Sequence, residues 1–186
     1  RFATGQNKEK KNIKNFYIDF METTLLEVIK KNIRLQLDAG AEVVMMFDSG
    51  ISSLENDFYR GRYRLLLKNI SNSFPNKVGY YARGKNYNEI SYLLDLPFAG
   101  LGVDSNVGLQ HIFLNSKFGF VQGNFNENHF LLDSKELENE LNTYLDTMKN
   151  IDNLNGWVCG LGHGINKATP EKNVHLFIET IRKKFN

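Results

Sequence analysis

The sequence has a single cysteine, almost no net charge and no long apolar run, and each scarcity excludes a class of protein. One cysteine in 186 residues excludes an internal disulfide framework and is typical of a reducing compartment, so we expect a cytoplasmic protein. No apolar run reaches the roughly 18 residues that a membrane span needs, so we expect no membrane partner. No signal peptide is visible, and because the chain opens at Arg1 rather than at Met we expect a fragment or a processed product.

The charges are nearly balanced, with 23 basic and 21 acidic residues and a net charge of +2. The basic run at residues 8–11 is short and is interrupted by Glu9, so a solvated loop explains it better than a polyanion site. No basic stripe with interleaved aromatic residues stands out, and we expect no nucleic-acid partner. With 41% hydrophobic residues, a chain of this length can bury a core of its own.

Short apolar runs alternate with amphipathic segments along the chain. The apolar runs are typical of strands that are covered on both faces. We expect strands at residues 43–47, 78–82, 98–103, 118–121 and 157–161. We expect helices at residues 16–37, 58–70, 87–94, 107–114, from 133 onward and from 170 onward.

Capping residues and apolar stripes mark the ends and the buried faces of the longer helices. Gly40 ends the first helix, and Asp133 with Glu136 three residues later is a helix-start signature. Thr169 is expected to cap the last helix, with Pro170 at its first position. The three stripes are Leu26, Ile29, Ile33 and Leu37; Leu137, Leu141, Leu145 and Met148; and Val174, Phe177, Ile178, Ile181 and Phe185.

Strand and helix alternate five times with short connections, which indicates a parallel sheet. A phosphate-binding glycine loop is absent, because the Gly-Leu-Gly at residues 100–102 has no third glycine and falls inside a strand. A (β/α)8 barrel needs about 250 residues. We therefore predict an α/β fold, a TIM barrel of which this chain supplies roughly the C-terminal five β/α units. Residues 1–186 would form part of one barrel, with residues 1–15 as a loop leading into the first helix.

Polar residues directly follow every predicted strand, where the active sites of α/β barrels lie. At any one position, a polar residue that simply begins a loop is the better explanation. Five such positions in register favour a functional face. The residues are Asp48, Ser49, Arg83, Asp104, Asn124, Asn126 and His163.

His163 carries the most weight among these residues. A lone histidine is usually structural or exposed, but Gly162 and Gly164 leave this one few neighbours to pack against, which favours a ligand-facing role. Its imidazole could donate to a carboxylate or titrate near neutral pH. The other histidines are expected to be surface or loop residues: His111, His129 and His175.

Metal binding and nucleophilic catalysis are not expected. Cys159 stands four residues before His163 with no other soft ligand nearby, and we expect it to pack within its strand. Ser49 lies outside any Gly-x-Ser-x-Gly elbow, so we interpret it as a hydrogen-bond donor to a bound ligand.

Taken together, these residues resemble the C-terminal half of the uroporphyrinogen decarboxylase family. The motifs occur in the family's order and cover essentially the whole chain. Leu-Gly-His-Gly is fairly specific, and the others persuade only as a set. They are Leu-Gly-His-Gly-Ile at 161–165, Thr-Pro-Glu at 169–171, Val-Gln-Gly-Asn at 121–124, Phe-Asp-Ser at 47–49, Gly-Val-Asp at 102–104 and Tyr-Ala-Arg-Gly at 81–84.

The resemblance implies a homodimeric TIM barrel in the cytoplasm that decarboxylates the four acetate side chains of uroporphyrinogen to give coproporphyrinogen, with no cofactor and no metal. It implies that Ser49 and His163 bind the substrate. An octacarboxylate needs cationic and hydroxyl donors, and loss of CO2 requires protonation of a pyrrole carbon. Arg83 could help with the carboxylates, although an ion pair explains it equally well. The family's catalytic aspartate and arginine segment lie in its N-terminal half. The catalytic residues therefore stay unknown here, and we expect the isolated chain to be inactive.

Several positions depart from the family pattern. The chain has Gly-Ile-Ser at 50–52, Ser105 in place of a tryptophan, and Phe-Asn-Glu at 125–127 in place of Leu-Asp-Pro. These departures leave open a divergent paralogue, such as a corrinoid or coenzyme methyltransferase, or a non-catalytic tetrapyrrole-binding fragment. The related zinc methyltransferases carry His-x-Cys where this chain has Tyr81-Ala82-Arg83, and a cysteine near His163, which argues against a zinc enzyme.

Overall fold

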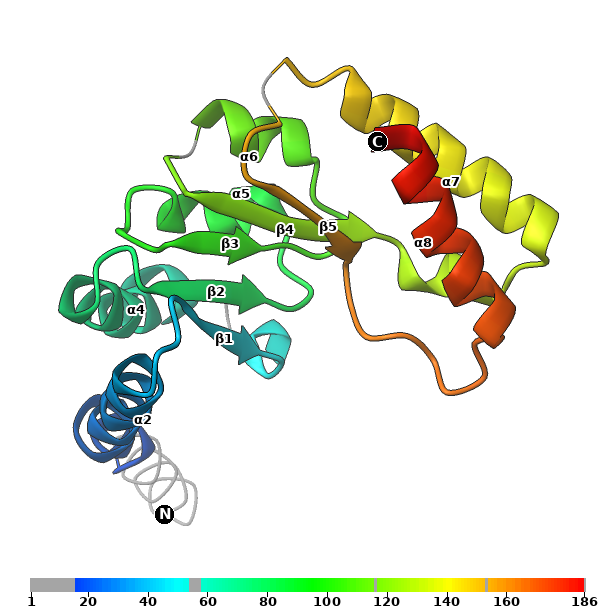
Figure 1. Ribbon diagram of the computed structural model, residues 1–186. Helices are drawn as coiled ribbons and strands as arrows, with labels where there is room; N and C mark the ends of the chain where they lie inside the picture. The colour runs from blue at the N-terminus through cyan, green and yellow to red at the C-terminus, as the bar shows by residue number, and fades with distance from the viewer. Residues whose placement is uncertain (1–15, 54–57, 116, 153, 186) are drawn as a thin grey trace, which may run out of the picture.

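A computed structural model describes residues 16–53, 58–115, 117–152 and 154–185, so the loop expected at residues 1–15 lies outside the described residues. Five parallel strands form one sheet in which every strand pairs with its neighbours in sequence, in the order β1-β2-β3-β4-β5 (Figure 1). The strands are β1 (Val44–Asp48), β2 (Val78–Ala82), β3 (Gly100–Gly102), β4 (Phe120–Phe125) and β5 (Trp157–Leu161). The predicted α/β class and all five strands are confirmed.

Helices connect the strands as the alternation predicted. The first helix runs from residue 16 through η1 (Met21–Leu25), a π-helical stretch, to the end of α2. The remaining helical elements are α2 (Leu26–Asp38), η2 (Ile51–Ser53), η3 (Tyr59–Tyr63), α4 (Arg64–Ser73), α5 (Tyr87–Ile90), η4 (Ser91–Leu93), α6 (Leu109–Asn115), η5 (Glu127–Leu131), α7 (Ser134–Lys149) and α8 (Glu171–Phe185). Among the described helices, none is both long and apolar enough to cross a membrane.

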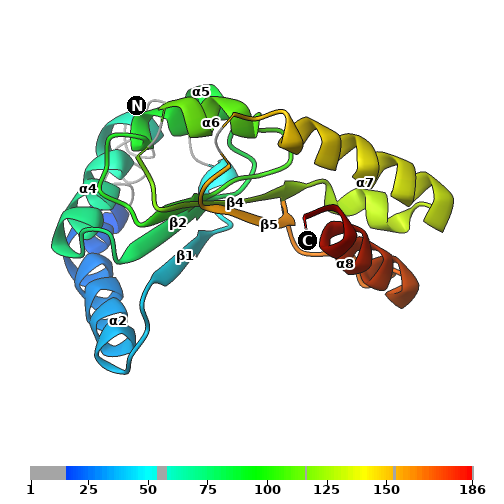
Figure 2. The same ribbon diagram turned by 45° about the horizontal axis from the view of Figure 1, so that its top comes forward.

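In the described part of the chain, the helices cover one face of the sheet and leave the other open (Figure 2). In Figure 2, α4, α5 and α6 lie over that face, and α2 and α8 flank the two edges. Right-handed crossovers that always advance to the next strand place every helix on the same side. This sequential order is the pattern of a barrel wall, whereas a doubly wound sheet reverses its strand order and carries helices on both faces.

The main apolar core lies between the sheet and the helices on its covered face. Val78 and Leu101 are fully buried there, and they pack with Ile33 of α2 and Leu67 of α4. The predicted stripe of the first helix is confirmed, since Leu26 and Ile33 are buried and Ile29 and Leu37 pack against the core. Gly40 ends this helix with a φ of +102°, a conformation that favours glycine.

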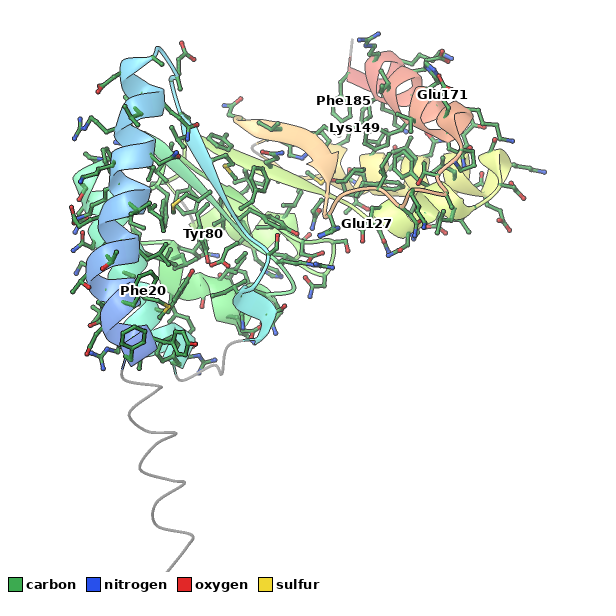
Figure 3. The ribbon with its side chains drawn as sticks, turned by 90° about the horizontal axis from the view of Figure 1, so that it is seen from below. Phe20, Tyr80, Glu127, Lys149, Glu171 and Phe185 are labelled. Carbon is green, nitrogen blue, oxygen red and sulfur yellow. The ribbon has the colours of Figure 1, made fainter. Side chains whose placement is uncertain are left out.

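A second core forms where α8 packs on α7. All four predicted stripe residues of α7 are buried, and α8 contributes Val174, Phe177 and Ile181. The prediction is wrong for Ile178, which is 40% exposed because it lies on the outer side of α8. Phe185 is also partly exposed, but its ring lies 5.4 Å from that of Trp157 and beneath the Lys149 ammonium (Figure 3).

The two predicted helix caps had different outcomes. The Asp133 carboxylate accepts the backbone N–H groups of Lys135 and Glu136, both at 2.9 Å, so this cap is confirmed. The Thr169 cap is wrong, because its hydroxyl oxygen is buried without a hydrogen-bond partner among the described residues. The start of α8 is held instead by the fully buried Asn173, whose amide donates to backbone carbonyls upstream of α7.

Candidate functional site

A cavity of about 290 Å³ opens on the uncovered face of the sheet, toward the carboxyl ends of the strands. Its volume is at the lower end of the range of roughly 300–1,000 Å³ that is usual for small-molecule sites. Both predicted substrate-binding residues, Ser49 and His163, line it. The full lining is Met45, Phe47, Ser49, Tyr81, Gly102, Val103, Gln122, Leu161, Gly162, His163 and Gly164.

The cavity floor is one row of residues that runs straight across the sheet. Phe47 pairs with Tyr81, Tyr81 with Gly102, and Gly102 with Gln122, so the three side chains of this row point to the same face. Tyr81 packs closely against Gly102 in this row. A Cβ atom at Gly102 would lie only 3.1 Å from Tyr81 Cβ, so a larger residue would crowd the tyrosine. The exposure of Phe47, at 66%, shows that this face is open in the described part of the chain.

His163 follows β5 and enters the cavity from the loop that leads to α8. Among the described residues its ring makes a single contact, in which Nδ1 lies 3.3 Å from the Gly164 carbonyl oxygen. Gly164 is exposed, and a Cβ atom there would meet nothing within 4 Å. The imidazole is partly exposed, and among the residues that the structure describes no hydrogen-bond partner faces its Nε2.

Ser49 approaches the same cavity from the opposite edge of the sheet, directly after β1. Its side chain is exposed, and within the described ranges its hydroxyl has no hydrogen-bond partner. The cavity thus combines an aromatic floor with two side-chain donors at its rim. This arrangement suits a ligand with a flat apolar body and peripheral hydrogen-bond acceptors.

Comparisons with known proteins agree with this geometry. The family model described as "Uroporphyrinogen decarboxylase (URO-D)" matches residues 16–184. The chain belongs to the uroporphyrinogen decarboxylase family. It is therefore related to a carboxy-lyase, and membership implies that its five strands are a portion of a TIM barrel.

Several curated relatives are named uroporphyrinogen decarboxylase. The chain is 30% identical to that of Orientia tsutsugamushi (strain Ikeda) over 153 residues, which are 79% of this chain and 44% of the relative. It is 28% identical to that of Hydrogenobaculum sp. (strain Y04AAS1) over 177 residues, which are 92% of this chain and 49% of the relative. It is 29% identical to that of Helicobacter pylori (strain G27) over 178 residues, which are 88% of this chain and 48% of the relative. The chain spans about half the length of these family members.

Most of the other polar residues at the strand ends have structural roles in this family member. The Asp48 carboxylate turns to the covered face, where the Tyr63 and Tyr80 hydroxyls donate to it, the latter at 2.9 Å. Figure 3 shows Tyr80 on the side of the sheet where α2 lies. Asp48 is the register partner of Ala82 and thus belongs to the opposite side of the strand from Phe47. Its expected place on the functional face is therefore wrong.

Asp104, Asn124 and Asn126 instead hold the loops together. Asp104 accepts the backbone N–H of Gly84 at 2.8 Å and so ties the β2–α5 loop to its own. The buried Asn124 amide donates to the Asp104 and Val107 carbonyl oxygens at 2.8 and 2.6 Å. Asn126 caps η5 through the Asn128 N–H at 3.0 Å. These side chains form hydrogen bonds with backbone groups of the loops that follow the strands, and so hold those loops in place.

Arg83 is exposed and does not line the cavity. Its guanidinium nevertheless lies near enough to Tyr81 to lower the pKa of that phenol, while Asp104 and Glu127 raise it. Burial is the largest influence, and the pKa of Tyr81 rises to about 12. The phenol therefore stays protonated and acts as a donor, and its hydroxyl donates to the Gly162 carbonyl oxygen at 2.7 Å.

Tyr81 and Gln122 are cavity residues that the motifs contained but did not single out. The available signal was the two-residue period of strands, which places residues 45 and 47, 79 and 81, and 120 and 122 on one face. Which face is the open one follows only from the crossovers. Sequence reasoning about strand ends could not supply it.

Cys159 packs within β5, as predicted, and burial raises the pKa of its thiol to about 12. Such a thiol is protonated and unreactive at neutral pH. Among the residues that the structure describes, no three His, Cys, Asp or Glu side chains are grouped closely enough to hold a metal ion. His175 and His111 are exposed as expected, whereas His129 is half-buried, with Nδ1 3.7 Å from a Glu140 carboxylate oxygen.

Proposed function

We propose that this chain is the C-terminal part of a uroporphyrinogen decarboxylase, which removes the carboxyl groups of the four acetate side chains of uroporphyrinogen to give coproporphyrinogen without a cofactor. The observation that supports this most is the cavity shared by Ser49 and His163. Family membership over residues 16–184 supports the same reaction class.

In this proposal the two rim residues bind substrate carboxylates. The His163 imidazole donates through a ring N–H, and the Ser49 hydroxyl donates from the other edge of the sheet. The aromatic rings of Phe47 and Tyr81 form the apolar surface on which a pyrrole ring rests. A hydrogen bond to an ionised carboxylate is shorter and stronger than one between neutral groups, so these two donors would orient the substrate.

The remainder of the site would come from the part of the family fold that this chain does not span. The relatives are about twice as long, and by resemblance the catalytic aspartate and arginines belong to their other half. We propose that this half closes the barrel over the open face. We also propose that the whole protein is a cytoplasmic homodimer. These 186 residues alone are expected to bind the substrate but not to turn it over.

Porphyrin binding tests the assignment without requiring turnover. Fluorescence titration of uroporphyrin, the oxidised octacarboxylate, with this chain measures affinity directly. Loss of one charge-assisted hydrogen bond of roughly 1.5–3 kcal/mol should weaken binding at least about 10-fold in His163→Ala. His175→Ala is the matched control, because that residue is exposed on α8 and is not part of the cavity lining. Urea unfolding of the same samples shows that each variant is folded.

Two results would contradict the proposal. One is equal affinity of His163→Ala and the parent chain for uroporphyrin. The other is equal affinity of the parent chain for uroporphyrin and for a porphyrin without carboxylates, since carboxylate recognition would then be absent.

A further inference from the structure

Gly162 is the fixed point from which the His163 loop departs. Its N–H donates to the Phe125 carbonyl oxygen at 2.8 Å, and its own carbonyl accepts the Tyr81 hydroxyl at 2.7 Å. A Cβ atom at Gly162 would lie 2.4 Å from the Ser105 backbone nitrogen. The residue is thus enclosed on three sides, by β4, by β2 and by the loop after β3.

The Gly162 carbonyl belongs to the peptide unit that ends at the His163 Cα atom. A peptide unit is planar and rigid, so a hydrogen bond that fixes the direction of this carbonyl also fixes the His163 N–Cα bond, and only rotation about that bond remains to direct the Cα–Cβ bond. Beyond this point the constraint disappears, since the imidazole has one weak contact and Gly164 is exposed. The position from which the His163 side chain leaves the backbone is therefore set at Gly162 rather than by contacts of the imidazole.

Tyr81 is suited to hold this carbonyl. The residue is only 8% exposed, and its ring centroid lies 5.8 Å from that of Phe47. Its side chain reaches from β2 to Gly162, directly after β5, where the hydroxyl forms its hydrogen bond. The phenol is locked in position by the strand and by its aromatic neighbour. It cannot follow a loop that swings away, so the hydrogen bond holds the loop to the sheet.

We infer that Tyr81 is a positioning residue for His163. The Tyr81 hydroxyl fixes the Gly162 carbonyl and so directs the imidazole into the cavity. The structural part of this inference stands on geometry. Its consequence for ligand binding rests on the proposed function. Tyr81 also forms part of the cavity floor, but Tyr81→Phe keeps the ring and removes only the donor.

The neighbouring Tyr80 supplies a matched control. It lies on the same strand and is 1% exposed, and its hydroxyl donates to the Asp48 carboxylate at 2.9 Å on the covered face. Tyr80→Phe therefore removes a buried tyrosine hydrogen bond, to a charged acceptor, that does not reach the cavity. Both variants should lower the midpoint of urea unfolding, and only one should affect His163.

Two measurements on this chain separate the effects. Imidazole proton and carbon resonances of His163, assigned with His163→Ala, report the orientation of the ring in the absence of ligand. Uroporphyrin titration reports affinity. We expect Tyr81→Phe to shift or broaden the His163 resonances and to weaken uroporphyrin binding about 3- to 10-fold, in line with one neutral hydrogen bond of about 0.5–1.5 kcal/mol. Tyr80→Phe should leave both unchanged.

Unaltered His163 resonances in a folded Tyr81→Phe chain would overturn the inference, as would equal shifts in Tyr80→Phe. Shifted His163 resonances in Tyr81→Phe alone, with no uroporphyrin binding by the parent chain, would support the positioning role and contradict the proposed function instead. The ligand-free measurement thus distinguishes the two failures.

Discussion

Replacement of Asn173 by aspartate should destabilise the protein in a pH-dependent way. Asn173 is fully buried, and its amide nitrogen donates to the Phe130 and Leu132 carbonyl oxygens, both at 2.9 Å. Its amide oxygen accepts the Ser134 hydroxyl at 3.1 Å. Asn173→Asp keeps the shape and replaces the double donor by an oxygen that faces two acceptors.

The size of the effect follows from these contacts. A buried polar group that loses its partner costs about 1–3 kcal/mol, so two unpaired carbonyls cost roughly 2–6 kcal/mol. This is a large part of the 5–15 kcal/mol that typically separates folded from unfolded domains. Burial raises the pKa of the new carboxyl, and the protonated form restores one donor. Because the folded-state pKa lies above the unfolded one, the variant should lose stability as pH rises from about 4 upward.

Urea unfolding followed by the fluorescence of Trp157, the single tryptophan, measures this directly. We expect the deficit of Asn173→Asp relative to the parent to be larger at about pH 8 than at about pH 5. Asn139→Asp is the control, because its side chain is exposed on α7 and the change should stay within about 0.5 kcal/mol. A loss of stability in Asn173→Asp below about 1 kcal/mol at both pH values would show that the Asn173 amide does not hold the Phe130 and Leu132 carbonyl oxygens as described.

The glycines on either side of His163 should respond differently to alanine. Gly162→Ala should lower the free energy of unfolding by about 1–3 kcal/mol, because its Cβ atom would lie 2.4 Å from the Ser105 nitrogen. Gly164→Ala should change the free energy of unfolding by only about a few tenths of a kcal/mol, because a Cβ atom there meets nothing within 4 Å. Equal effects of the two variants in urea unfolding would contradict this difference. Cys159→Ala should flatten the loss of stability between pH 9 and 10. Its thiol has an ordinary pKa of 9.0 that burial raises to about 12, so the unfolded chain ionises first as pH rises. A parent and a variant that lose stability in parallel over this interval would show that the thiol is not buried.

The fold was predictable because its signals are local and repeated. Apolar runs such as residues 78–82 have no polar interruption, which is the pattern of a strand covered on both faces. The α7 stripe recurs at the helical period, and Asp133 caps that helix as its position suggests. The exceptions lie at α8. A side chain with no local signature, Asn173, anchors this helix in place of Thr169, and only the tertiary structure brings it against carbonyls some 40 residues away.

The candidate site was only partly predictable, because position at a strand end does not tell which side a residue faces. Asp48 and Ser49 are adjacent, yet the first is bound by tyrosines behind the sheet and the second lines the cavity. Alternation along β1 separates them once one inward residue is known. The sequence shows that alternate residues of a strand face opposite sides of the sheet. It does not show which set faces the open side, because that depends on the side on which the crossover helices lie.

Two of the three departures from the family pattern that the resemblance implies, Ser105 and residues 125–127, have a physical connection to the His163 loop. Phe125 accepts the Gly162 N–H at the start of the His163 loop, and the same β4–α7 connection supplies the carbonyls that hold Asn173 beyond its end. The substitutions at residues 125–127 thus fall on the segment that anchors both ends of the loop. Ser105, another of these departures, lies against Gly162 itself. Substitutions at these positions would therefore act on the placement of the imidazole through the Gly162 hydrogen bonds and packing.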